Sequence, residues 1–122
     1  MIVFDYMARA AFILFFALLI IDFFVLDCLL RWEYRDASEA WDADGRPHGY
    51  FWIPPESKVL GGLLVSLRSG RALRRITFEW FFKTPEWMLK QDGARLLLWL
   101  HRMLVFTIYL PLIFLIALAV FQ

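Results

Sequence analysis

Asp22 is the residue of this sequence whose chemistry is hardest to accommodate, because it is a carboxylic acid inside the apolar run of residues 10–30. It lies nine positions before Arg31, which is about 13 Å along a helix. If the run crosses a bilayer, an ionised carboxylate at that depth costs about 2.5–3.5 kcal/mol to insert. Asp22 should therefore make an intramembrane polar contact with protein, and Thr107, Tyr109 or a group on another subunit is the expected partner.

Two roles fit such a carboxylate. It could carry protons or ions across the membrane, or it could act as a polar clamp that fixes how helices pack. A relay would need further titratable groups, but Asp27, the other acid of the run, is expected to pair with Arg31 at i, i+4 spacing. We therefore interpret Asp22 as a clamp and keep the proton path as an alternative hypothesis.

The remaining candidates for chemistry do not form a catalytic or metal-binding set. A histidine that ligates a cofactor within a membrane must lie well inside an apolar run, whereas His48 and His101 lie outside the runs. The sequence has no zinc-protease motif, phosphate loop or dinucleotide fingerprint, and its one cysteine, Cys28, excludes an internal disulfide. We predict no enzyme activity, no cofactor, no metal site and no small-molecule substrate.

A row of arginines precedes a cluster of aromatic rings within residues 68–87. The row consists of Arg68, Arg71, Arg74 and Arg75, and helical spacing places it on one face, with Leu73, Ile76 and the rings in the other directions. A helix of this kind lying flat on a membrane places guanidinium groups among phosphates and rings at the acyl boundary. We predict that the row contacts anionic lipid headgroups; the alternative is a solvated basic face with the rings packed on protein.

Composition places the whole chain among membrane proteins. Hydrophobic residues make up 61% of its 122 residues, against roughly 45–50% in soluble proteins. One domain of this length could not bury so much apolar surface in water. The net charge of +1 gives no field that would favour nucleic acid as a partner.

Two runs are long enough to cross a bilayer. Residues 10–30 and 103–121 comprise 21 and 19 positions, whereas a spanning helix needs about 20. We read the first run as an uncleaved anchor, because it lacks the charged leader and cleavage site of a signal peptide. Pro111 should kink the second run, because it cannot donate a backbone hydrogen bond to Thr107.

The basic residues predict the orientation. Twelve of the thirteen Lys and Arg residues lie within residues 31–102, and cytoplasmic segments are the ones enriched in these residues. The sequence therefore predicts a multi-pass protein of the bacterial inner membrane, with both termini outside and residues 31–102 in the cytoplasm.

The central segment is expected to be helical and interfacial. Residues 31–45 should extend the first helix to a turn at its end, residues 46–55 should form a proline-rich loop, and residues 56–70 show the period of an amphipathic helix. Thr84 is predicted to cap a further helix that bends at Asp92-Gly93 and runs into the second span. The predicted interfacial anchors are Trp32, Trp52, Trp80, Phe81, Trp87 and Trp99. The predicted fold is an all-α membrane protein, with two spans joined by interfacial helices.

Three stretches resemble the universal stress protein B family of small two-span bacterial membrane proteins. "WDADGRPHGYF", residues 41–51, is similar to that family's acidic turn and aromatic segment, and "VSLRSGRALRR", residues 65–75, to its basic amphipathic helix. "QDGARLLLWLHRML", residues 91–104, resembles the lead-in to its last span. The similarity covers residues 34–116 and implies an integral membrane protein, without implying a mechanism.

These features predict a non-catalytic accessory or structural subunit of a larger inner-membrane complex, bioenergetic or transporting. Two helices make a poor bundle, and lipid provides no hydrophobic drive for their association. The expected partners are therefore the bilayer and other membrane subunits or further copies of the chain. Two alternatives are a free-standing stress or envelope protein that acts through lipid contact, and a small proton or ion conductor that uses Asp22.

Overall fold

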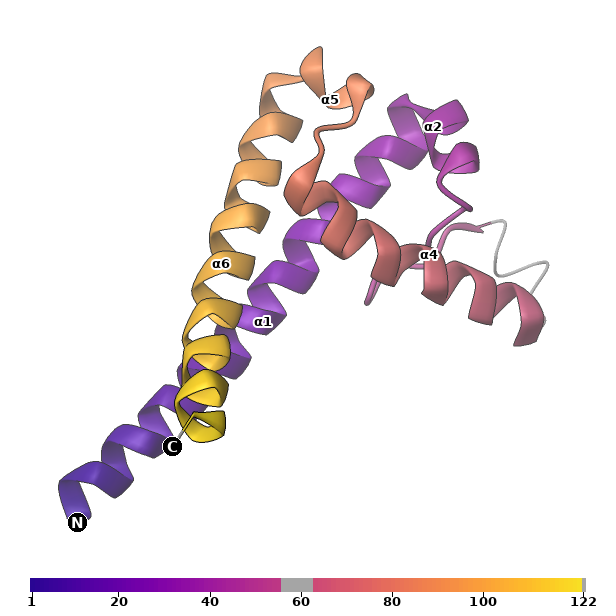
Figure 1. Ribbon diagram of the computed structural model, residues 1–122. Helices are drawn as coiled ribbons and strands as arrows, with labels where there is room; N and C mark the ends of the chain where they lie inside the picture. Colours follow the sequence, from indigo (N-terminus) through magenta and orange to yellow (C-terminus); the bar gives the residue numbers. More distant parts are fainter. Residues whose placement is uncertain (56–62, 122) are drawn as a thin grey trace.

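Two long antiparallel helices dominate the fold. A computed structural model describes residues 1–55 and 63–121, and the described residues contain helices but no strand. Helices α1 (Ile2–Asp36) and α6 (Asp92–Val120) form a hairpin with both termini toward the same end (Figure 1). Each is long and apolar enough to cross a membrane. The predicted all-α class and its two candidate spans are therefore confirmed at this level.

Helix α1 is longer than the apolar run that predicted it. It extends beyond residues 10–30 at both ends, because residues 2–9 and 31–36 contain no glycine or proline that would interrupt a helix. It ends where Ala37 adopts φ −139° and ψ 55° and donates its backbone N–H to the carbonyl of Glu33. The predicted continuation past Arg31 is therefore present, but a separate helix follows it.

The segment that follows α1 folds back against the end of the hairpin opposite the two termini (Figure 1). Helix α2 (Ser38–Ala43) leads into the predicted turn, where Gly45 has φ +95°. Residues 46–54 then run without helix along α1. Helix α4 (Leu63–Phe82) follows. Of the amphipathic helix predicted over residues 56–70, residues 56–62 lie outside the described part of the chain, and residues 63–70 belong to α4.

The predicted entry into the second span was partly wrong. Pro85, with φ −60° and ψ 145°, caps the short helix α5 (Glu86–Leu89), so the predicted cap at Thr84 is one residue too early. Gln91 is extended, with φ −124° and ψ 100°, and separates α5 from α6. A single helix running from Thr84 into the span is therefore replaced by two.

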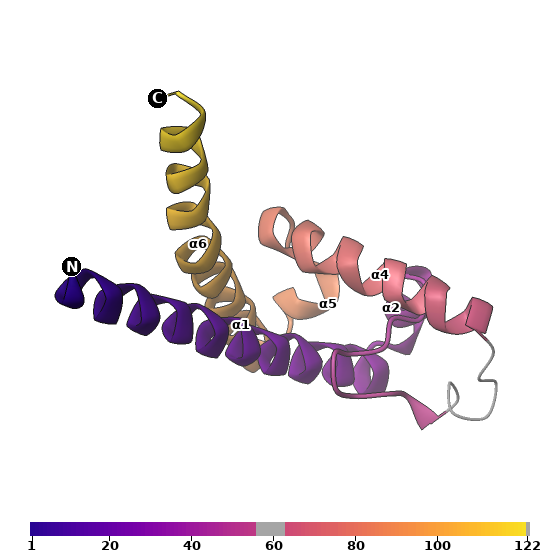
Figure 2. The same ribbon diagram turned by 90° about the horizontal axis from the view of Figure 1, so that it is seen from below.

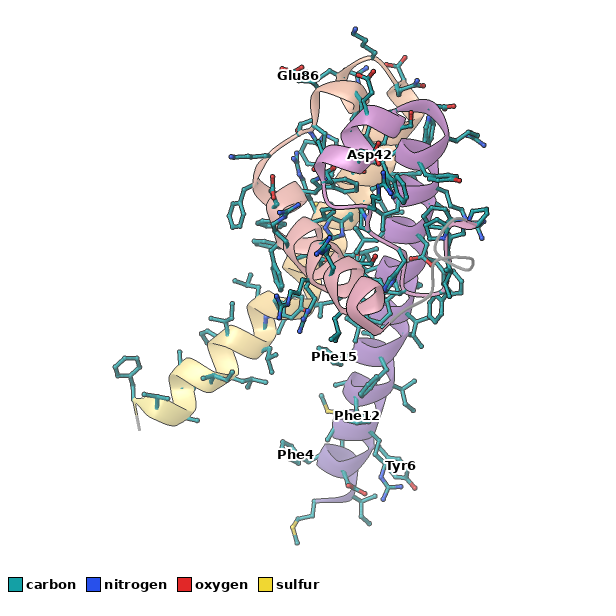
Figure 3. The ribbon with its side chains drawn as sticks, turned by 90° about the vertical axis from the view of Figure 1, so that its right-hand side faces the viewer. Phe4, Tyr6, Phe12, Phe15, Asp42 and Glu86 are labelled. Atoms are coloured by element: carbon teal, nitrogen blue, oxygen red, sulfur yellow. The ribbon has the colours of Figure 1, made fainter. Side chains whose placement is uncertain are left out.

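The core lies at the end of the hairpin opposite the two termini, which we call the loop-bearing end (Figure 1). Fully buried apolar side chains come from the second half of α1, from α4, from α5 and from the first half of α6; they include Leu26, Leu29, Leu30, Ile76, Met88 and Leu98. The other ends of α1 and α6 diverge (Figure 2). In Figure 3 the labelled Phe4, Tyr6 and Phe12 project from the N-terminal half of α1, far from Asp42 and Glu86. Each of those three rings is at least 64% exposed.

Helix α4 lies across the two long helices instead of along them (Figure 1). The buried residues of α4 recur at a spacing of three or four, which aligns them on one face; they are Ala72, Leu73, Ile76 and Trp80. That face packs on the loop-bearing end of the hairpin, and α4 thereby braces α1 against α6.

Candidate functional site

A buried acid–histidine pair joins the two long helices. Oδ1 of Asp22 on α1 lies 2.6 Å from Nδ1 of His101 on α6. Asp22 is 3% exposed and His101 is fully buried. The polar protein contact expected for Asp22 is therefore made within the chain, by a residue that the sequence interpretation had placed outside the apolar runs.

The same histidine also binds α4. Its Nε2 lies 2.9 Å from the backbone carbonyl of Thr77, whose hydroxyl donates to the carbonyl of Leu73. A carbonyl can only accept, so Nε2 carries a hydrogen. The short contact between Nδ1 and Asp22 then requires one shared proton, either as imidazolium and carboxylate or as imidazole and carboxylic acid. In both forms the pair is neutral overall and ties three helices together.

The two partners predicted for Asp22 lie elsewhere. The hydroxyl of Thr107 donates to the carbonyl of Met103 on its own helix and is exposed. The ring of Tyr109 packs against Phe78 of α4, with a centroid separation of 6.3 Å. A signal for His101 was present in the sequence, because it falls in a stripe of buried positions on α6. The stripe is Ala94, Leu98, His101, Leu104, Val105 and Ile108.

Asp27 binds the proline-rich loop instead of Arg31. Its carboxylate accepts backbone N–H bonds from Tyr50, Phe51 and Trp52 at 2.6, 2.8 and 3.0 Å. Arg31 is exposed on the surface. The predicted i, i+4 pair is thus wrong, because three amide donors satisfy a buried carboxylate better than an exposed guanidinium.

Glu33 is a buried acid at the loop-bearing end, three residues beyond the apolar run. It is fully buried, and its Oε2 accepts a 2.9 Å hydrogen bond from Nε1 of Trp87. Burial and, next, the neighbouring Asp44 carboxylate raise the pKa of Glu33 from 4.5 to about 9, against the smaller opposing effect of the Trp87 bond. Glu33 is therefore protonated at neutral pH, and its buried Oε1 has no hydrogen-bond partner among the described residues. The sequence interpretation had not singled out this residue.

The four arginines of the predicted row are exposed on α4. Arg75 donates a 2.6 Å hydrogen bond to the backbone carbonyl of Asp44 and lies 3.6 Å from Glu79. Leu73 and Ile76 face the core, as their predicted direction requires. The rings were expected in that direction too, but Phe78 and Phe82, at 54% and 79% exposure, share the arginine face.

The predicted interfacial anchors occupy different environments. Trp99 is 63% exposed, whereas Trp80 is 2% exposed and belongs to the core. The remaining four, Trp32, Trp52, Phe81 and Trp87, are partly buried. Trp80 therefore packs on protein and is not an outward-facing anchor, because it lies on the face of α4 that meets the hairpin.

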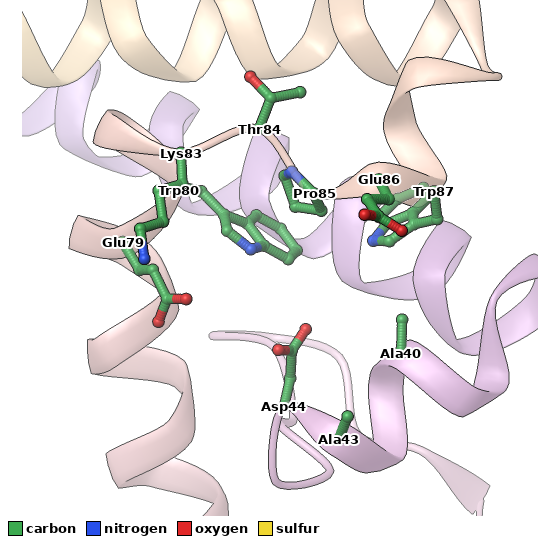
Figure 4. Close-up of a pocket in the computed structure, with 10 residues that line it drawn as sticks. All are labelled: Ala40, Ala43, Asp44, Glu79, Trp80, Lys83, Thr84, Pro85, Glu86 and Trp87. Atoms are coloured by element: carbon green, nitrogen blue, oxygen red, sulfur yellow. The ribbon is translucent and has the colours of Figure 1, made fainter.

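A cavity of about 330 Å³ lies between α2, α4 and α5 (Figure 4). Carboxylates of Asp44, Glu79 and Glu86 surround it together with Lys83, and the indoles of Trp80 and Trp87 form part of its wall. Within residues 1–55 and 63–121, no three His, Cys, Asp or Glu side chains are grouped to hold a metal ion.

No protein-family model, curated protein or solved structure matches this chain. The resemblance to the universal stress protein B family therefore stays a prediction from three short stretches of sequence.

Proposed function

We propose that the protein is a non-catalytic accessory subunit of a larger bacterial inner-membrane complex. The observation that carries this proposal is the divergence of the two apolar helices (Figure 2). Beyond Asp22 on α1 and Ile108 on α6, toward the two termini, no described residue is buried. Phe15, Leu18, Leu19 and Tyr109 are partly buried against the core, and beyond them the two hydrophobic helices are largely exposed.

Membrane helices gain stability by close packing with other helices, because lipid is as apolar as their side chains. The divergent halves of α1 and α6 lack such packing with each other. Helices of a larger assembly, or of a second copy, would provide it. This is the physical reason to prefer an assembled subunit over a free-standing hairpin.

The polar groups within the fold support a structural role. Asp22 and His101 neutralise each other away from solvent, and Asp27 is saturated by backbone donors. A proton conductor would need these groups to exchange protons with water on both sides. The observed bonds instead suit a rigid connection between helices. The charge distribution supports the proposed orientation, with the central segment in the cytoplasm and both termini outside.

Gentle solubilisation tests this function. The tagged protein should co-purify stoichiometrically with large membrane subunits in mild detergent, and should resist extraction by alkaline carbonate. Recovery as a lone monomer or dimer would contradict the accessory role and favour the lipid-acting envelope protein. Release by carbonate would contradict membrane integration itself.

A measurement of proton flux in liposomes tests the remaining alternative, that the protein conducts protons. Purified protein in liposomes should conduct no protons, and Asp22→Asn should leave that result unchanged. Proton flux that appears with the native protein and disappears in Asp22→Asn would replace the structural role by conduction.

A further inference from the structure

The exposed face of α4 changes character along its length. Arg71 and Phe78 are seven residues apart, as are Arg75 and Phe82, and seven residues are about two helical turns. One face therefore presents arginines in its first half and phenylalanines in its second. We name the set Arg68, Arg71, Arg74 and Arg75 the arginine half, and the set Phe78, Phe81 and Phe82 the phenylalanine half.

The phenylalanine half lies beside the second candidate span. Phe78 packs on Tyr109, and the buried Trp80 anchors this part of α4 to the hairpin. Rings on the long helices and on the loop that Asp27 binds are exposed as well: Phe24, Phe51 and Phe106 are each more than half exposed. Phe24 and Phe51 stack with centroids 4.8 Å apart.

The arginine half lies farther from the hairpin. The start of α4 extends away from α6 (Figures 1 and 2) and is held by the turn after α2, where the Ser69 hydroxyl donates to the Arg46 carbonyl. All four guanidinium groups are exposed, and Arg75 alone of the four has an ion-pair partner within the described structure, Glu79. The arginine half and the phenylalanine half lie on the same face of α4. One binding partner must therefore suit both charged and aromatic side chains.

We propose that α4 lies in the headgroup layer of the membrane, where its arginine half binds the phosphates of anionic phospholipids and its phenylalanine half enters the acyl boundary. Charge selects the partner, because phosphodiester groups accept the forked donors of arginine. Because α4 lies across the spans, its exposed face stays near the membrane surface along its whole length, where long arginine side chains reach the phosphates and the rings reach the acyl boundary. This inference rests on the proposed membrane placement and names a lipid as a partner within it.

Lipid selectivity of the full chain tests the proposal. The protein is reconstituted in vesicles of phosphatidylcholine with a minority of phosphatidylglycerol, and motional restriction of spin-labelled forms of each lipid is compared. The native protein should restrict phosphatidylglycerol preferentially. An arginine near an anionic surface favours binding by about fivefold, equivalent to about 1 kcal/mol, so Arg68→Gln, Arg71→Gln and Arg74→Gln together should reduce the preference at least about fivefold. Arg75 is retained because it bonds the Asp44 carbonyl.

A matched variant controls for total charge. Arg35, Lys90 and Arg95 are exposed and belong to other parts of the chain than α4, so their combined change to Gln should leave the preference intact. Equal loss in both triple variants, or no loss in the α4 variant, would overturn the proposal, as would an α4 face occupied by another protein and closed to lipid.

Salt provides a second readout that needs no folded variant. At about 1 M salt the Debye length falls to about 3 Å, so the native preference should disappear, whereas a preference that persists would contradict headgroup binding. Carbonate washing separates failure of this proposal from failure of the proposed function. If lipid selectivity is absent but the protein stays in washed membranes and co-purifies with other subunits, only the lipid proposal is wrong.

Discussion

At the scale of single residues, the buried polar groups of this protein are connectors. Asp22, Asp27 and Glu33 lie on one helix, yet each reaches a different element: α6, the proline-rich loop and α5. A buried acid without such a partner would cost several kcal/mol, because its charge or its hydrogen-bonding capacity would go unsatisfied. The acids of α1 therefore determine where the rest of the chain attaches.

The shared proton between Asp22 and His101 predicts unequal effects of two substitutions. Asp22→Leu leaves Nδ1 of His101 buried without a partner, and should lower the free energy of unfolding by about 1–3 kcal/mol. Asp22→Asn should cost less, because its amide can donate to a neutral Nδ1. Detergent-induced unfolding measures both. Thr107→Ala is the control, since the Thr107 hydroxyl is exposed and bonds only its own helix; an effect as large as that of Asp22→Leu would refute the assignment.

Glu33 predicts how stability depends on pH. Its pKa is raised from 4.5 to about 9, so between these values the folded chain holds a proton that the unfolded chain has lost. Its contribution to the free energy of unfolding is complete below pH 4.5, falls as pH rises and is gone above pH 9. Glu33→Gln keeps an acceptor for Trp87 and should remove that part of the slope. Unfolding curves from pH 5 to 9 measure it, and an unchanged slope would show that Glu33 does not titrate as described.

At the scale of elements, close contacts decide how the helices dock. An alanine Cβ at position 93 would lie 2.6 Å from the Trp32 ring, whereas one at position 70 would have no other atom within 4 Å. Both glycines are helical, so intrinsic propensity alone favours alanine at each by roughly 0.5–1 kcal/mol. Only the tertiary contact separates them.

We therefore expect Gly70→Ala to raise the thermal unfolding temperature and Gly93→Ala to lower it. The ring of Trp32 can move only by disturbing the contact between α1 and the start of α6. Circular dichroism in detergent measures both temperatures. A stabilising Gly93→Ala would mean that α6 does not approach Trp32 closely in the folded protein.

At the scale of the whole molecule, the hairpin places its two termini at one end and its folded elements at the other (Figure 1). A protein that crosses a bilayer twice in this way has its folded end on one side only. The concentration of Lys and Arg within residues 31–102 is the basis for proposing that this side is cytoplasmic.

Cysteine labelling tests that orientation. Cys28 is exposed and is first replaced by Ser. An impermeant maleimide should then label Val3→Cys in intact spheroplasts, because Val3 is 70% exposed near the N-terminus. Lys83→Cys, at another exposed position, should react only after permeabilisation. Reaction of Lys83→Cys in intact spheroplasts, with Val3→Cys protected, would reverse the orientation.

The sequence by itself determined the helical class and the two candidate spans, because long apolar runs form helices through local hydrogen bonds, in the second run even with Pro111 inside it. It also pointed to Asp22 as a residue in need of a protein partner. The partner was decided by the tertiary structure: His101 meets Asp22 only because α1 and α6 pack in one register, and Asp27 meets the loop at residues 50–52 only because that loop folds back along α1. Such pairings join residues far apart in the chain, and periodicity within one helix carries no information about which helix or loop will lie beside it.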